Sequence, residues 1–424
     1  MSGIERGRRP RAQLWGHPDF LKLWAGQTVS ELGSQVSFIA IPLTAVTVLG
    51  AGPFQTGLLG ALQFLPFLLL GLPAGVWVDR LAHRPVLIVA DLGRMLALAS
   101  VPVAWALGGL HLPQLYAAGF VVGVLTVFFD VAYQSYLPAL VEREQLVEGN
   151  SKLALTQSTA EVAGPGVGGL LVGLASAPYA VAADAASYAI SVVGLLLIRR
   201  REPRVERPAR AGLRAELLEG LRFVLGHRLL RSIAACTGLS NLFAHAGMAV
   251  LFVYAVRDLG LSAGSIGLWF SLGSLGGPLG ALLVARLERR LGTGRTIVAT
   301  AWLGLPSWVL LVLAPRSFPM PFLIASGIVG SLAGVAYNIT QISLRQAITP
   351  RHLQGRMNAT MRFLVWGTIP LGAFAGGVMG SLLGLRATLL AAAAGQLLAA
   401  LPVTLSGVRR LRRVEDAMPA LAGG

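Results

Sequence analysis

The sequence predicts an all-α membrane protein with twelve transmembrane helices in two bundles of six. Composition, the spacing of charges and an internal repeat support this prediction. Of the 424 residues, 54% are hydrophobic and 13% are charged, with a mean hydropathy of +0.68. Soluble domains carry about 25% charged residues. The composition therefore excludes a water-soluble fold.

Charged residues divide the chain into long apolar intervals, because a charge at the centre of a bilayer costs at least about 2.5–3.5 kcal/mol. The intervals cover residues 22–79, 85–140, 152–199, 231–257, 258–286, 295–345 and 362–409. Five of them are long enough for two spans, with turns at glycine or proline such as 50–53 and 315–321. The other two hold one span each, which gives twelve spans in total.

The arginines indicate how the spans are oriented. An even number of spans places both termini on one side, together with most of the arginines. Only Arg257, Arg316 and Arg386 fall on the opposite side. By the positive-inside rule, both termini are expected in the cytoplasm of a bacterium, with the protein in its plasma (inner) membrane. This topology accounts for the net charge of +16, so nucleic acid is not an expected partner.

The two halves of the chain repeat at a shift of 208 residues. The matching positions are Asn150 and Asn358, Gly164 and Gly372, and Gly168-Gly169 and Gly376-Gly377. We expect one bundle from residues 1–198, a second from 229–424, and between them a cytoplasmic linker, 199–228, with an amphipathic helix. Parallel repeats of this kind place a substrate site between the halves, and a monomer suffices to enclose it.

A loop motif follows the second expected span. It reads Gly75-Val-Trp-Val-Asp79-Arg80-Leu-Ala-His83-Arg84 and resembles the signature loop of the major facilitator superfamily. The resemblance implies that Gly75 permits close helix approach, and that Asp79, Arg80 and Arg84 latch the cytoplasmic side when the cavity faces outward. Ala82 and His83 stand where the family has glycine and a base, which leaves the turn and one contact open. The alternative is a plain positive-inside anchor, which Asp79 opposes.

A charged pair lies in the third expected span. Asp91 and Arg94 are three residues apart, close enough on one helix to form an ion pair. A buried arginine requires an acidic partner. We interpret the pair as structural, and we expect Arg94 also to join the latch through Asp79 or Asp130.

The fifth expected span contains Glu161-Val-Ala-Gly164-Pro165-Gly166-Val-Gly168-Gly169. This segment resembles the Gly-Pro motif of the antiporter branches of the superfamily. Proline bends the helix, and glycines four residues apart allow another helix to approach closely. Ordinary helix packing is the alternative.

A wider resemblance covers nearly the whole chain. The segment Phe129-Asp130-Val-Ala-Tyr133-Gln134-Ser-Tyr-Leu-Pro138, the Gly-Pro motif and Gly355-Arg356-Met357-Asn358 look like the branch containing macrolide efflux proteins and the enterobactin exporter. The resemblance implies the major facilitator fold and proton-driven extrusion of bulky, amphipathic compounds.

Three acidic residues within the spans are candidates for proton coupling. Glu31 lies in a polar stripe on the first span, Asp130 lies in the fourth, and Glu161 is expected near the middle of the membrane. A buried, hydrogen-bonded carboxyl that holds helices together is the alternative role for Glu31. Polar and aromatic residues at helical spacing are the candidates for lining the substrate cavity. They are Gln27, Gln35, Phe38, Tyr133, Gln134, Asn241, His245, Phe252, Asn338 and Gln341.

Taken together, the sequence favours a proton-coupled exporter of amphipathic small molecules such as drugs, macrolides or siderophore-like metabolites, working by alternating access. An uptake carrier for a small polar solute and a non-transporting sensor on the same scaffold are the alternatives. The motifs of metallohydrolases, serine hydrolases and phosphate-binding loops do not occur. We therefore expect no enzyme activity, no cofactor and no metal, with protons, the small-molecule substrate and the lipid bilayer as the only partners.

Overall fold

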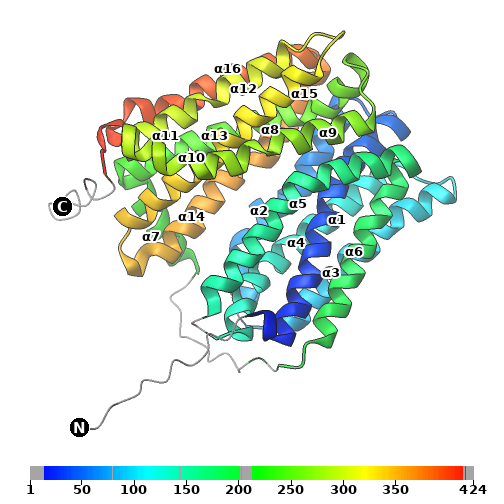
Figure 1. Ribbon diagram of the computed structural model, residues 1–424, viewed down its shortest axis with the longest axis horizontal. Coiled ribbons are helices and arrows are strands. Elements are labelled where there is room, and N and C mark those ends of the chain that lie inside the picture. The colour runs from blue at the N-terminus through cyan, green and yellow to red at the C-terminus, as the bar shows by residue number, and fades with distance from the viewer. Residues whose placement is uncertain are drawn as a thin grey trace, which may run out of the picture.

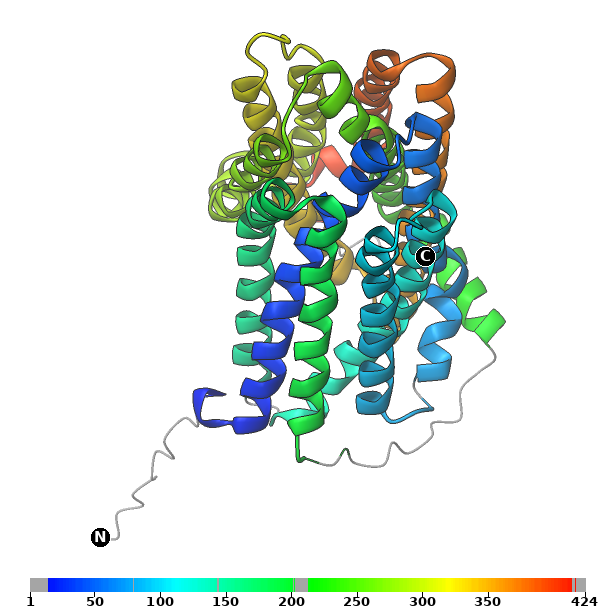
Figure 2. The same cartoon turned by 90° about the vertical axis from the view of Figure 1, so that its right-hand side faces the viewer.

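The computed structural model describes residues 14–78, 80–142, 145–200, 202, 213–413 and 416, apart from the side chains of Leu72, Val76, Arg351 and residues 213–217. Six long helices form the first bundle (Figure 1). They are α1 (Pro18–Leu43), α2 (Pro53–Val78), α3 (His83–Ala106), α4 (Leu112–Leu140), α5 (Leu146–Ala175) and α6 (Ala177–Leu197). α1 begins and α6 ends at the same end of this bundle (Figure 2).

The second bundle repeats this arrangement with interrupted helices. Its elements are α8 (Arg228–Val253), α9 (Ala263–Ser274), α10 (Gly276–Leu291), α11 (Thr293–Trp302), α12 (Gly304–Val312), α13 (Met320–Ile348), α14 (Gln354–Trp366), α15 (Thr368–Leu382) and α16 (Leu385–Leu405). The pairs α9–α10, α11–α12 and α14–α15 each form one membrane-length run. The prediction of a helical fold in two bundles is confirmed.

Eleven runs in the described part of the chain are long and apolar enough to cross a membrane. The sequence predicts twelve spans, and the remaining one is α5. This helix has 30 residues and packs along α1 and α9, but its first half is polar, with Glu148, Lys152, Gln157 and Glu161. These side chains lower the mean hydropathy of α5 but leave the helix long enough to cross a membrane. With the eleven runs above, α5 makes twelve.

The ends of equivalent spans have matching backbone geometry. A five-residue π-helix extends the first span of each half, at Thr44–Val48 and Tyr254–Asp258. Each is followed by a glycine with a φ of 65°, Gly50 and Gly260. Ser176 and Gly384, 208 residues apart, also share a positive φ, of 86° and 90°. The repeat is therefore visible in backbone conformation as well as in sequence.

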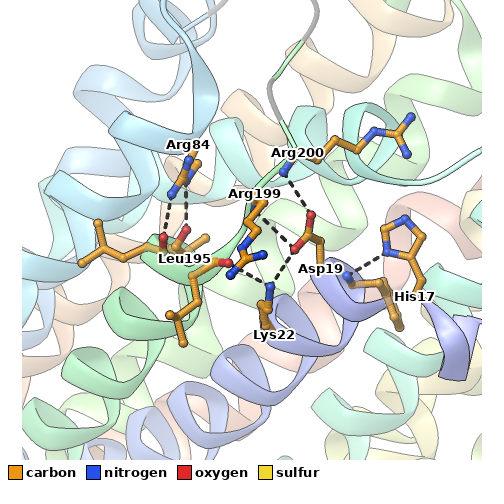
Figure 3. A network of polar contacts seen from close by, with 10 residues as sticks. His17, Asp19, Lys22, Arg84, Leu195, Arg199 and Arg200 are labelled. Atoms are coloured by element: carbon orange, nitrogen blue, oxygen red, sulfur yellow. Dashed lines mark hydrogen bonds and ion pairs between the residues drawn. The ribbon is translucent and has the colours of Figure 1, made fainter.

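The first bundle is closed by polar contacts between the start of α1 and the end of α6 (Figure 3). The carboxylate of Asp19 accepts hydrogen bonds from the backbone N–H groups of Arg199 and Arg200, at 3.3 and 3.0 Å. Lys22 donates to Asp19 at 2.9 Å and to the carbonyl of Leu197 at 2.8 Å. These contacts fix the point at which the chain leaves the first bundle.

Helix α7 (Leu213–Gly226) lies in the segment that connects the bundles and packs against α14. Val224 is fully buried, and a side chain on Gly220 would collide with Thr360. Glu219 forms an ion pair with Arg356. The connecting helix is thus attached to the second bundle.

The bundles converge at the end opposite the start of α1 (Figures 1 and 2). Glycines form two close crossings between the bundles. A Cβ on Gly57 of α2 would lie 2.4 Å from the Cα of Gly377 of α15, and a Cβ on Gly169 of α5 would lie 2.9 Å from the Cα of Gly267 of α9. Arg257 adds a polar contact by donating to the backbone carbonyls at residues 50 and 51, each at 3.0 Å. We call this region the closed end.

Gly169→Val is expected to open the closed end. The side chain would overlap the carbonyl oxygen of Ala263, which lies 2.5 Å from the Cβ position, and such overpacking costs about 1–3 kcal/mol. Gly173→Val is the matched control on the same helix, because no atom lies within 4 Å of its Cβ position. To test this opening, cysteines are introduced at the exposed positions of His111 and Ser317 in a Cys236→Ser background and are spin-labelled. Double electron–electron resonance then measures the distance between the two labels. Longer distances are expected for Gly169→Val alone, and identical distributions for the two variants would contradict the prediction.

Candidate functional site

One cavity, of about 560 Å³, lies within the second bundle. We call it the C-half cavity. Its lining comes from α8, α11, α12, α13, α14 and α16. Hydroxyl, amide and guanidinium groups share the lining with aromatic rings. The polar and aromatic members are Thr237, Ser240, Asn241, Thr300, Ser307, Trp308, Tyr337, Asn338, Gln341, Arg345, Arg362, Trp366 and Gln396.

A second cavity of about 260 Å³ lies between the bundles. We call it the inter-half cavity. Its lining residues are Phe67, Gly71, Gly75, Val127, Val131, Gln134, Ser135, Ala359, Arg362, Phe363 and Trp366. They belong to α2, α4 and α14. Arg362 and Trp366 line both cavities, so they stand where the two spaces adjoin.

Four of the residues predicted to line the pathway border these cavities. Asn241, Asn338 and Gln341 line the C-half cavity, and Gln134 lines the inter-half cavity. The Gln341 amide donates to the side-chain oxygen of Asn338 at 2.9 Å. The Asn241 amide donates to the carbonyl of Val365 at 3.2 Å, which ties α8 to α14. These amide side chains therefore line the C-half cavity, and their hydrogen bonds fix their orientation.

Two glutamines of the polar stripe on α1 contact neighbouring helices of their own bundle. Gln27 is buried and donates to the hydroxyl of Ser191 on α6 at 3.2 Å. Gln35 packs against Gly164 of α5, where an added Cβ would lie 2.3 Å from the Cβ of Gln35. Both residues lie outside the lining of the two cavities.

The aromatic candidates bridge the bundles. The Phe38 ring of α1 lies 6.1 Å from Phe252 of α8 and 5.3 Å from Phe270 of α9, in edge-to-face geometry. His245 meets the ring of Phe64 on α2 at 5.6 Å, and its Nδ1 lies 2.9 Å from the carbonyl oxygen of Asn241. Aromatic packing thus joins the halves between the closed end and the cavities. Tyr133 instead stacks on Phe129 of its own helix, with ring centroids 5.7 Å apart.

The three candidate coupling acids all belong to the first bundle. Glu31 and Asp130 are half-buried, whereas Glu161 is exposed and accepts a hydrogen bond from Gln157 at 3.2 Å. Glu31 is close enough to Asp130, Glu161 and Arg94 for their charges to interact. The acids are therefore parts of one electrostatic network. Among the described residues, no three histidine, cysteine or acidic side chains gather as a metal site.

The centre of this network is Arg94 of α3. Its guanidinium forms an ion pair with Asp91, and both side chains are buried. The same group lies 4.1 Å from the ring centroid of Phe129 and 4.4 Å from that of Tyr188. An acid and two aromatic faces therefore compensate this buried cation.

The residues predicted as a latch make contacts within the first bundle. Arg84 donates from Nε to the carbonyl of Leu195 and from Nη2 to that of Leu196, both at 2.9 Å (Figure 3). Arg80 is exposed, and no atom lies within 4 Å of a Cβ on Gly75. Asp79 lies outside the described residues. Ala82, the N-cap of α3, adopts an ordinary extended φ of −66°, whereas Gly292, the N-cap of α11, has a φ of 83°.

With this geometry established, comparison with known proteins gives the family. A family model described as transmembrane secretion effector matches residues 15–421. The chain belongs to this branch of the major facilitator superfamily. It is an integral membrane protein, and the proteins that it resembles are transporters.

Two named relatives align with most of this chain. The multidrug efflux pump Tap of Mycobacterium tuberculosis (strain H37Rv) is 30% identical over 418 residues, covering 95% of this chain and 94% of that protein. The enterobactin exporter EntS of Escherichia coli O127:H6 is 25% identical over 355 residues, covering 81% of this chain and 80% of that protein. The resemblance to the branch containing the enterobactin exporter is confirmed.

Solved structures share the fold of this chain at low sequence identity. A bacterial homologue of the iron transporter ferroportin in its inward-facing state has a TM-score of 0.75 and 16% identity, covering 91% of this chain and 98% of that chain. An outward-facing state of a bacterial ferroportin homologue has a TM-score of 0.60 and 18% identity, with the same coverage. Both structures therefore share the fold of this chain.

Several residues of the closed end and the cavities give little signal in the sequence. Gly57 and Gly267, the partners of the repeated glycines at the closed end, carried a weak signal, because small residues are common in membrane helices. Arg345 appeared only as the limit of an apolar interval. Arg362 likewise limits an apolar interval in the sequence, and it lines both cavities.

Arg94→Gln is expected to destabilise the protein strongly, because it leaves the fully buried Asp91 without its cation. Breaking a buried pair in this way lowers the free energy of unfolding by about 3–5 kcal/mol. Lys22→Gln removes a partly exposed partner of Asp19 and is the control, with an expected loss of about 1 kcal/mol or less. Denaturant unfolding of the purified protein in detergent measures both. Equal losses in the free energy of unfolding would show that the Arg94–Asp91 ion pair stabilises the protein no more than the Lys22–Asp19 ion pair does.

Proposed function

We propose that this chain is a proton-coupled exporter of amphipathic small molecules. One observation carries the proposal: the halves are held together at the closed end, while both cavities lie toward the other end, next to a network of carboxylates in the first bundle. A relative named a multidrug efflux pump and another named an enterobactin exporter support the direction of transport. The substrates would be bulky molecules with both apolar and polar surfaces.

The orientation follows from the charges. Arginines concentrate at the end where the termini lie, so that end is cytoplasmic by the positive-inside rule. The cavities then open toward the cytoplasm, and this conformation is the inward-facing one. In the outward-facing conformation the glycine crossings separate, and Arg80 and Arg84 close the cytoplasmic side in a rocker-switch cycle. A single chain encloses the pathway, so a monomer suffices.

Glu31 is the coupling acid in this proposal. It lies on α1, close enough to the carboxylates of Asp130, Glu161 and Asp184 for their charges to interact, so loss of its charge would relieve repulsion among them. A proton taken from outside could thus be exchanged for substrate leaving the cytoplasm. Asp130 and Glu161 would receive or share that proton.

Glu31→Gln is expected to abolish coupled proton release. Everted vesicles energised to an acid interior are given macrolides, lipophilic cations, siderophores or sugars, and a pH-sensitive dye reports protons leaving the lumen. Wild type is expected to respond to an amphipathic compound, and Glu31→Gln to give no response above the baseline recorded without a compound. Glu288→Gln, which removes an acid on α10 outside both cavities, is the control.

Two results would contradict this proposal. A response to simple sugars alone would indicate a carrier for polar solutes. An undiminished response in the Glu31→Gln variant would remove that residue from the coupling pathway.

A further inference from the structure

The C-half cavity contains a half-buried arginine whose hydrogen-bond partners are uncharged. Arg345 of α13 donates from Nη1 to the amide oxygen of Gln341 and from Nη2 to that of Asn358, both at 3.1 Å. Its Nε is buried without a hydrogen-bond partner. The positive charge is therefore oriented by its neighbours but not neutralised by them.

A second arginine lines the same cavity. The guanidinium of Arg362 on α14 lies 4.9 Å from the ring centroid of Trp366. It is close enough to Asp130 on the opposite bundle for their charges to interact, but among the described residues it forms no ion pair. Arg362 is exposed to the space that both cavities share.

The second bundle has no acid to compensate these charges. Between residues 229 and 413 the sequence has only two acidic residues, Asp258 and Glu288. Asp258 lies 3.9 Å from Arg316 and from Arg386 beyond the closed end, and Glu288 lies on α10, outside the cavity lining.

The first bundle provides the contrast, because Asp91 pairs directly with the buried cation of Arg94. A partly buried charge without a counter-charge costs free energy, and it persists where it faces water or a ligand.

We propose that the C-half cavity binds an anionic group of the substrate, in the first instance a carboxylate. Arg345 and Arg362 would hold it through charge-assisted hydrogen bonds, for which the planar guanidinium is suited. Trp308 and Trp366 line the same cavity and would pack against the apolar part of the molecule. This inference rests on the proposed export function and narrows its substrate to amphipathic organic acids.

Matched pairs of ligands that differ only in charge test the proposal. The full chain, reconstituted in nanodiscs, is titrated calorimetrically with fusidate, deoxycholate and dansyl-undecanoate, and with the methyl ester of each. At least one acid is expected to bind about tenfold or more tightly than its ester, the usual size of a hydrogen bond to a charged group. Arg345→Gln and Arg362→Gln are each expected to bring that ratio close to one while leaving affinity for the ester unchanged.

Two controls separate charge recognition from loss of folding. Arg286→Gln removes an exposed arginine on α10 outside both cavities and is expected to keep the wild-type ratio. Arg345→Lys restores a positive charge and is expected to recover part of the preference. If no acid binds more tightly than its ester, or if the preference survives in both glutamine variants, the proposal is overturned.

The outcome is also distinct from that of the export proposal. Preferential binding of an acid without any proton release would retain the anion site and count against coupled export. Proton release driven by neutral or cationic compounds, without tighter binding of any acid than of its ester, would support coupled export and overturn the anion site.

Discussion

The arrangement of the molecule depends on two glycine crossings between its halves. Gly57 meets Gly377, and Gly169 meets Gly267, at distances that a single Cβ would not allow. Gly169 and Gly377 are equivalent in the repeat, and so are the helices that they approach. The halves therefore meet through two symmetry-related helix crossings formed by small residues. Such crossings allow close packing and contain no large side chains that would have to disengage when the halves separate.

The halves share a backbone plan but differ in charge. The first bundle carries the acids Glu31, Asp130 and Glu161 around the paired Arg94, whereas the cavity of the second is lined by Arg345 and Arg362 without an acid. Arg362 and Asp130 belong to opposite bundles and are close enough for their charges to interact. A movement of the halves necessarily changes that interaction. Binding of protons on one side and of an anion on the other would thus act on the same charges.

Much of the fold could be predicted from the sequence, because the cost of charge in a bilayer fixes where spans begin and end. Helix α5 is the informative exception, since its polar first half hides a 30-residue helix from a hydropathy criterion. The site was harder to predict. Helical spacing alone does not reveal that Gln27 faces Ser191 within its own bundle, or that Arg362 faces a cavity. Those directions depend on which helices pack together.

A reversible lock at the closed end tests the account most directly. The Cβ position of Gly60 lies 3.4 Å from the Cβ of Ala373, close to the separation found in disulfides, about 3.5–4.5 Å. Gly60→Cys with Ala373→Cys, in a Cys236→Ser background, is oxidised, and transport of the compound that gives the largest wild-type response is measured. The account predicts that oxidation stops transport and that reduction restores it. Full transport by the cross-linked protein would contradict separation of the halves at this contact.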